Sequence, residues 1–236
     1  MQIRLIAHGA SRWERFLRKW GISFLIDDDI LFDTFGDPMV LLNNIRKFNI
    51  DVAKIKYIVL SHDDWDHIAG LWYLLPNRKD MTVYICPGFQ QEIKKKITSF
   101  GINVIEAKGI ISIKDGIYST GELFGESGTR RIFEQSLVVK GGSGLAVVCG
   151  CAHPGILNIV KHVKNNFQED VYALVGGFHL KESTRREIYD IIIKIKELNI
   201  KRVIPAHCTG KLAITKFKQQ FSEDFINVKE GSVIEV

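Results

Sequence analysis

Residues 62–67 constrain the fold of this chain more than any other segment. They follow the apolar run at residues 57–60 after a single serine, and they hold two histidines and three aspartates in six positions. An apolar run that ends in such a turn is typical of a buried strand that brings its last side chains to one edge of a sheet. Neutral imidazole and carboxylate are good ligands for zinc, iron and manganese. A solvated acidic turn would account for Asp63 and Asp64 but not for the flanking histidines, so the pattern favours a metal site.

Three later segments have the same form, an apolar run that ends in a histidine among small residues. These are His153 in Gly-Cys-Ala-His-Pro-Gly-Ile, His179 in Gly-Gly-Phe-His-Leu and His207 in Pro-Ala-His-Cys-Thr-Gly. Small residues at a strand end let the backbone and a ligand approach closely. We therefore expect four strand ends to converge on one pocket.

Together these motifs resemble the metallo-β-lactamase superfamily, and the resemblance covers nearly the whole chain. Residues 21–26 and 30–34 look like the first hairpin of that family. The usual signature His-x-His-x-Asp-His reads His-x-Asp-x-Asp-His here, because Asp64 stands at the second histidine. The three late histidine motifs look like the branch named for a dihydropterin–ribofuranosylaminobenzene phosphate synthase.

The resemblance implies one or two metal ions, zinc or else manganese or iron. A carboxylate at Asp64 favours harder ions than the usual histidine does. The family usually adds a bridging aspartate at the end of a later strand, where this chain has Gly-Gly-Phe-His at residues 176–179. The implied ligands are His62, Asp64 and His153 for one site, and Asp66, His67 and His207 for the other.

Asp66 and His179 are the residues we expect to take part in catalysis. A metal lowers the pKa of bound water toward ~7 and polarises a carbonyl or phosphoryl oxygen. Asp66 can orient or deprotonate the nucleophile, and His179 can contact the substrate or donate a proton. The alternative for His179 is a buried histidine hydrogen-bonded to the backbone. We expect Asp33 to support the ligands from beneath, and Glu134 and Gln135 resemble a polar pair of the same branch.

The overall composition sets further limits. With 236 residues the chain suits one domain, residues 1–236. A net charge of +5 permits a small anionic substrate and does not require nucleic acid. The first residues are too short an apolar run for a signal peptide, and no run approaches the ~20 apolar residues of a membrane span, which predicts a cytoplasmic protein. In that compartment the four cysteines are reduced. They suit small buried positions, or, for Cys151 and Cys208, thiolates near the metal.

Alternating strand and helix patterns favour an α/β fold. Two similar halves of this kind suit two packed sheets flanked by helices, and the resemblance implies the four-layer αββα sandwich of the metallo-β-lactamase family. Residues 12–20 suit a helical turn or a loop over the site. The expected strands are residues 2–7, 23–26, 30–33, 55–60, 82–86, 102–105, 172–175, 202–205 and 232–236, with short antiparallel strands between 109 and 148, and the expected helices begin at residue 38 and cover 68–75, 87–100, 154–166, 184–198 and 212–221.

The ligand set predicts first a metal-dependent hydrolase of small phosphorylated or ester substrates. The late motifs favour instead a transferase that releases diphosphate, as in the synthase branch. A phosphodiesterase or nuclease is compatible with the altered signature, although no basic stripe with interleaved aromatic residues is present. A binding module that kept the fold without catalysis is the fourth alternative.

Overall fold

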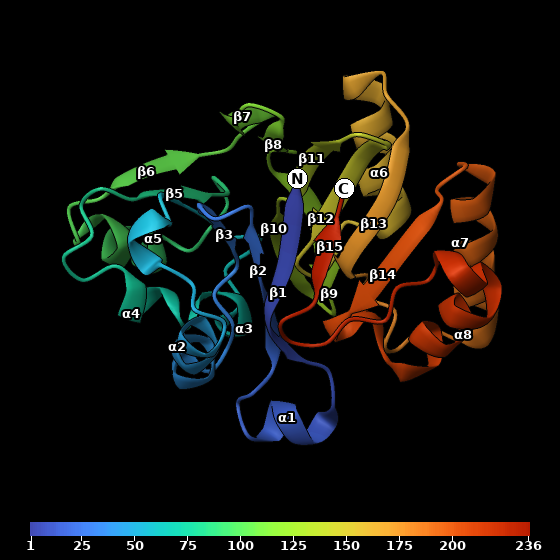
Figure 1. The fold of residues 1–236 in the computed structure, drawn as a ribbon, viewed down its shortest axis with the longest axis horizontal. Helices are drawn as coiled ribbons and strands as arrows, with labels where there is room; N and C mark the ends of the chain where they lie inside the picture. The colour runs from blue at the N-terminus through green and yellow to red at the C-terminus, as the bar shows by residue number, and fades with distance from the viewer.

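Two mixed sheets pack face to face in the computed structural model of the protein (Figure 1). The structure describes residues 1–236, apart from the side chain of Arg12. Strands β3 to β6 pair in parallel, and so do β12 to β14, as expected for strands joined by helical crossovers. In spatial order the first sheet is β15 (Val233–Glu235), β1 (Gln2–Gly9), β2 (Gly21–Ile26), β3 (Ile30–Phe32), β4 (Tyr57–Val59), β5 (Thr82–Ile85) and β6 (Asn103–Glu106). The second is β14 (Arg202–Ala206), β13 (Val171–Gly177), β12 (Gly144–Cys149), β11 (Leu137–Gly141), β8 (Ile117–Ser119) and β7 (Ile111–Lys114), and a separate hairpin joins β9 (Leu123–Ser127) to β10 (Arg130–Glu134).

Helices cover the outer face of each sheet (Figure 1). On the first sheet these are α2 (Pro38–Lys47), α3 (Trp65–Ile68), α4 (Leu71–Leu74) and α5 (Gln91–Thr98), and on the second they are α6 (Ile156–Phe167), α7 (Arg185–Glu197) and α8 (Lys211–Phe221). Asp37 caps α2 with its side chain, and Thr184 begins α7 with a capping box, in agreement with the helix starts expected at residues 38 and 184. The remaining helix, α1 (Arg12–Phe16), projects from the end of the sheets between β1 and β2.

Three apolar layers hold the elements together. Side chains such as Leu5, Phe24 and Val175 fill the space between the two sheets. Leu41, Leu71 and their neighbours pack the first sheet against its helices, and a third cluster packs the second sheet against α6, α7 and α8. Four layers of secondary structure thus enclose three cores, which confirms the αββα sandwich.

The single helix predicted over residues 68–75 is wrong, because the segment forms two short helices, α3 and α4. In a continuous helix the N–H of Leu71 would donate to the carbonyl of His67. Thr34 interrupts this bond: its hydroxyl and its N–H donate to that carbonyl, and the hydroxyl oxygen accepts from Leu71. At Gly70 an added Cβ would lie 2.2 Å from the Thr34 carbonyl oxygen, so the contact needs glycine.

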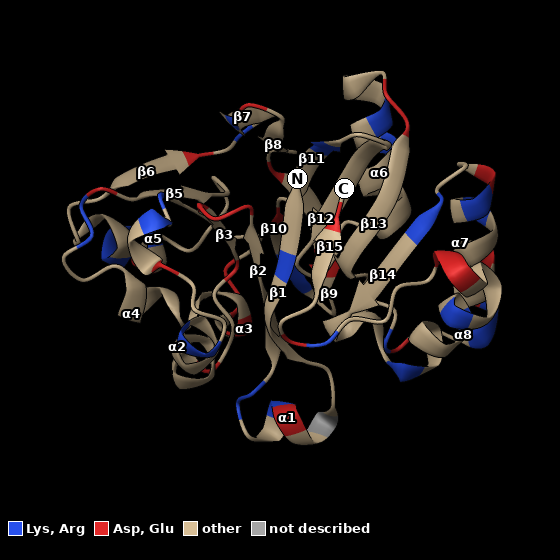
Figure 2. Cartoon of the chain, in the orientation of Figure 1, with Lys and Arg blue, Asp and Glu red and all other residues tan. Residues whose placement is uncertain are grey.

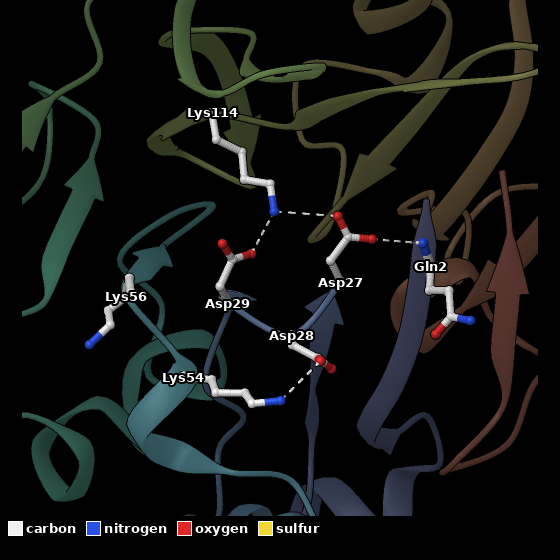
Figure 3. Close-up of a pocket in the computed structure, with 7 residues that line it drawn as sticks. All are labelled: Gln2, Asp27, Asp28, Asp29, Lys54, Lys56 and Lys114. Carbon is white, nitrogen blue, oxygen red and sulfur yellow. Dashed lines mark hydrogen bonds and ion pairs between the residues drawn. The ribbon is translucent and has the colours of Figure 1, made fainter.

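Charged side chains lie on the outer helices and the loops, and the strands between them are largely uncharged (Figure 2). Within the residues that the structure describes, no helix has the length and apolar character needed to cross a lipid bilayer. A surface cavity of about 540 Å³ surrounds the turn at Asp27–Asp29 (Figure 3). There Lys114 pairs with Asp27 and Asp29, and Lys54 pairs with Asp28, so these charges offset one another.

Candidate metal centre

Four histidines meet where strands of both sheets end. His62 follows β4 in the first sheet, whereas His153 and His207 follow β12 and β14 in the second. The ring centroids of His62 and His67 are 4.1 Å apart, those of His62 and His153 4.7 Å, and those of His67 and His207 5.2 Å. The structure thus brings together the histidines that the sequence placed in one pocket.

The Nδ1 atom of each of these histidines has a hydrogen-bond partner. Donation from Nδ1 fixes the tautomer and leaves Nε2 with a lone pair for a metal, an arrangement common around metal centres. The partners are Asp33 Oδ2 for His67 (2.6 Å), Ser61 Oγ for His62 (2.8 Å), Glu134 Oε2 for His153 (2.8 Å) and the Gly9 carbonyl oxygen for His207 (2.8 Å).

The Nε2 atoms of His62 and His207 are buried and, within the described part of the chain, make no hydrogen bond. Each lies 3.5 Å from a carboxylate oxygen, of Asp64 and Asp66 respectively. Leaving such a group without a partner costs about 1–3 kcal/mol. A bound cation would satisfy both nitrogens, so the donor set fits a metal.

Three groups of side chains have ligand atoms that all lie within 4.8 Å of one another. Cys151 belongs to all three groups, which was not expected for a residue weighed mainly as a small buried side chain. The groups are His62, Cys151 and His153; His67, Cys151 and His207; and Cys151, His179 and Cys208.

Asp33 is the centre of a buried network beneath the histidines. Its Oδ1 accepts from the Ser61 N–H at 2.7 Å, and its Oδ2 accepts from the Ser61 hydroxyl at 2.7 Å and from His67. Ser61 Oγ in turn accepts from His62, so one carboxylate orients both histidines of the first sheet. The expected position of Asp33 beneath the ligands agrees with this geometry.

Glu134, whose role the sequence left open, holds the loop that carries His153. Its carboxylate accepts from the backbone N–H groups of Cys151, Ala152 and His153 at 2.7–2.9 Å, and from His153 Nδ1. Burial raises the pKa of Glu134, but the bond from His153 and the other donors outweigh burial and hold that pKa well below its usual value. The side chain of Gln135, which follows β10, donates to the carbonyl of Leu60, which follows β4, so this bond joins the ends of the two strands.

Glu134→Gln is expected to weaken metal binding by about 10–100-fold, the usual cost of losing a partner that orients a ligand. In the variant the amide N–H₂ group would face at least one of the N–H groups that now donate to the carboxylate. Because both are donors, that hydrogen bond would be lost. Isothermal titration with zinc would measure the change, with Glu126→Gln on the exposed part of β9 as the control. Equal affinities in the two variants would contradict the role of Glu134.

Asp64 and Asp66 lie at the open side of the cluster. Asp64 pairs with Arg130, which also contacts Asp63 at 3.2 Å. Burial raises the pKa of Asp64, but His62 and Arg130 outweigh it and lower that pKa. For Asp66 the neighbouring His67 and His207 likewise outweigh burial, and its pKa lies well below the usual value. Both side chains are therefore carboxylates at neutral pH.

His179 lies at the mouth of the site and is exposed, so the alternative of a buried histidine is wrong. Its ring centroid is 4.3 Å from that of His153. A hydrogen bond with Cys208 raises its pKa above the usual value, although burial opposes this change. His179 is thus placed to hold a proton at the edge of the cluster.

His8 contacts the site, although no pattern in the sequence pointed to it. Its Nε2 accepts from the His207 N–H at 2.9 Å. Burial, together with the nearby His207, lowers the pKa of His8 to about 4, so it stays neutral and keeps this acceptor. Only the spatial neighbourhood reveals this role, because His8 and His207 are 199 positions apart.

Strained backbone gathers around the cluster. Asp33, Ala152, His179 and His207 have φ between 47° and 60°, a region that residues other than glycine rarely adopt. Each such residue costs on the order of 1–3 kcal/mol and persists where the surroundings demand it.

A cavity of about 370 Å³ opens onto the histidines and carries a basic rim. Lys181 lies with its Nζ 4.6 Å from the centre of the Trp20 ring. The sequence did not single out this rim, because its members come from distant loops. The basic lining residues of the cavity are Arg15, Arg130 and Lys181, and Trp20, His179 and the acidic residues Asp64, Asp66 and Glu182 line it as well.

Comparison with known proteins gives consistent matches. The protein-family model described as the metallo-beta-lactamase superfamily matches residues 23–207. A 7,8-dihydropterin-6-methyl-4-(beta-D-ribofuranosyl)-aminobenzene-5'-phosphate synthase of Methanocaldococcus jannaschii is 28% identical, over 93% of this chain and 90% of its own. The crystal structure of Tm1679, a metal-dependent hydrolase of the β-lactamase superfamily, superposes with a TM-score of 0.81 at 28% identity, covering 100% of this chain and 99% of the other. The metallo-beta-lactamase fold protein YhfI from Bacillus subtilis, at 15% identity and a TM-score of 0.69 over 99% and 98% of the two chains, shares the fold.

Proposed function

Because the chain belongs to the metallo-β-lactamase superfamily, we propose that it is a metal-dependent hydrolase of a small phosphorylated or ester substrate. The observation that carries this proposal is the set of oriented histidines beside a basic rim, of which His62 and His207 have buried Nε2 atoms with no partner among the described residues. A hydrolase of the same superfamily with a TM-score of 0.81 supports it. Proposed ligands are His62, Asp64 and His153 in one site, and Asp66, His67 and His207 in the other.

When bound, the metal supplies Lewis acidity that activates water and polarises a phosphoryl or carbonyl oxygen. The side chains of the protein then position the reactants. Asp66 orients the attacking water and accepts its proton through a carboxylate oxygen that lies 3.4 Å from His67 Nε2 and 3.5 Å from His207 Nε2. His179 donates a proton to the leaving oxygen from the open side of the pocket. Lys181 and Arg15 attract the phosphate.

A transferase of the synthase type is the second candidate. The observation that favours it is the 28% identity to the M. jannaschii synthase over 93% of the chain. In such a reaction the basic rim would bind a departing diphosphate, and an acceptor nitrogen would take the place of water. The cavity of about 370 Å³ suits a small molecule in either case.

Phosphate release from a panel of phosphorylated small molecules, by enzyme loaded with zinc, iron or manganese, would test the hydrolase. Release of diphosphate from diphosphate esters, with and without an aromatic amine as acceptor, would test the transferase. Release without an amine supports hydrolysis, and release only with an amine supports transfer. If no loaded form acts on any substrate, both proposals fail, and the phosphodiesterase and the binding module remain.

Lys181→Met is expected to raise KM for a phosphorylated substrate about tenfold or more, since a hydrogen bond to a charged group contributes about 1.5–3 kcal/mol. Hydrolysis of an uncharged ester should change much less. Lys194→Met, on the exposed face of α7, is the matched control. If both substrates were affected equally by Lys181→Met, the lysine would not be a phosphate contact.

A further inference from the structure

We propose that Cys151 is the shared ligand of the metal centre and bridges its two sites through Sγ. This inference rests on the metal centre proposed above and adds a ligand to it. The sulfur lies 3.4 Å from His67 Nε2. Cys151 is also the one residue common to the group with His62 and His153 and to the group with His67 and His207. A ligand that serves both pairs must lie between them, and Cys151 does.

Two independent observations point to a ligand at this place. The buried Nε2 atoms of His62 and His207, one from each group, have no hydrogen-bond partner among the described residues. Each group therefore contains a nitrogen that can bind a metal ion, and the sulfur of Cys151 lies within 4.8 Å of both nitrogens. A thiolate there would complete two nitrogen–sulfur sets of the kind that zinc prefers.

The end of β13 leaves the position open for this sulfur. An added Cβ at Gly177 would lie 2.2 Å from the Gly150 carbonyl oxygen, 2.7 Å from Cys208 Sγ and 3.2 Å from Cys151 Cα. At Gly176 the added atom would lie 2.1 Å from the Cys149 carbonyl oxygen. Neither position has room for a carboxylate, so a carboxylate bridge from these two residues is excluded. In the proposed centre the loop that carries Cys151, held by Glu134, supplies the bridge instead.

Metal binding replaces the thiol proton. The S–H bond of Cys151 breaks, a metal–sulfur bond forms, and the proton leaves to solvent with no change of oxidation state. Because thiolate is a soft ligand, the centre should select zinc or iron over manganese. Cys208 is not expected to bridge the two sites. It belongs only to the group with His179, and not to the groups of His62 with His153 or of His67 with His207.

X-ray absorption of the zinc-loaded protein tests the bridge without recourse to activity. With two zinc ions bound, a bridging sulfur gives a Zn–S distance of about 2.3 Å with about one sulfur per zinc, and a terminal sulfur gives about half of one. Cys151→Ser is expected to lose this signal, to bind less zinc and, with cobalt, to lose the sulfur-to-metal charge-transfer band. Cys208→Ser, its matched control, should keep all three.

The outcomes separate this inference from the proposed function. Zinc bound through nitrogen and oxygen alone in the unmodified protein overturns the bridge but leaves a metal-dependent enzyme. A sulfur signal that persists in Cys151→Ser and disappears in Cys208→Ser assigns the ligand to Cys208 and also overturns the bridge. No zinc in the unmodified protein overturns the metal centre itself. Since the unmodified protein gives the sulfur count, the test stands even if Cys151→Ser does not fold.

Discussion

His207→Ala is expected to lower the affinity for metal by more than the ~100-fold that loss of an orienting partner costs, and to abolish metal-dependent turnover. The variant loses a whole ligand whose Nε2 is buried and otherwise unpartnered within the described residues. The fold should survive, because among the described residues the ring bonds through Nδ1 to a single group, the Gly9 carbonyl. Elemental analysis of protein purified without chelators, beside circular dichroism, measures both effects.

A matched histidine outside the cluster gives the control for this experiment. His162 on α6 hydrogen-bonds to the Thr120 carbonyl at 3.1 Å and, within the described part of the chain, belongs to none of the three groups of ligand atoms. His162→Ala should keep its metal content and its activity. A folded His207→Ala variant that binds metal as the parent does would remove His207 from the ligand set.

Asp33→Ala is expected to lower the free energy of unfolding by about 3–5 kcal/mol, the usual effect of breaking a buried charged pair. The change removes the acceptor of three donors: the Ser61 N–H, the Ser61 hydroxyl and His67 Nδ1. None of the three can reach water from its buried position, so each would bear a desolvation cost. A loss of this size is a large part of the ~5–15 kcal/mol that stabilises a typical domain.

Urea unfolding measured with chelator present separates this loss from any loss of bound metal. Asp28→Ala is the control, because the side chain of Asp28 is 76% exposed and its pair with Lys54 contributes at most about 1 kcal/mol. If the two variants unfolded at the same urea concentration, the network at Asp33 would not contribute to folding.

Strands, helix starts and pocket residues could be predicted from the sequence where the pattern lies within one short segment. The motif at residues 62–67 and the capping box at Thr184 are local patterns, and the structure has both in the expected places. The second sheet was not evident from periodicity. Apolar runs such as Val171–Gly177 are buried on both faces, so they carry no alternation that would tell which face meets the first sheet.

The roles that sequence reasoning missed depend on contacts between residues far apart in the chain. Glu134 clamps a loop that lies 17–19 positions further along, and Arg130 reaches Asp64 from a separate hairpin. The importance of Cys151 depends on the space at Gly177, which only the packing of two strand ends reveals. Helix α3 does not continue into α4, because the hydroxyl of Thr34, more than 30 positions earlier in the chain, donates to the carbonyl of His67.

The histidine cluster draws on both sheets, and this has a consequence for the order of folding. His62 and His67 come from the first half of the chain, whereas His153 and His207 come from the second, and His207 also needs His8 and Gly9. No early segment can hold the metal in its final geometry while the chain is still being synthesised. Contacts of such long range form late. We therefore expect the newly made protein to become competent for metal only after both halves have docked, so that metal uptake reports completion of the fold.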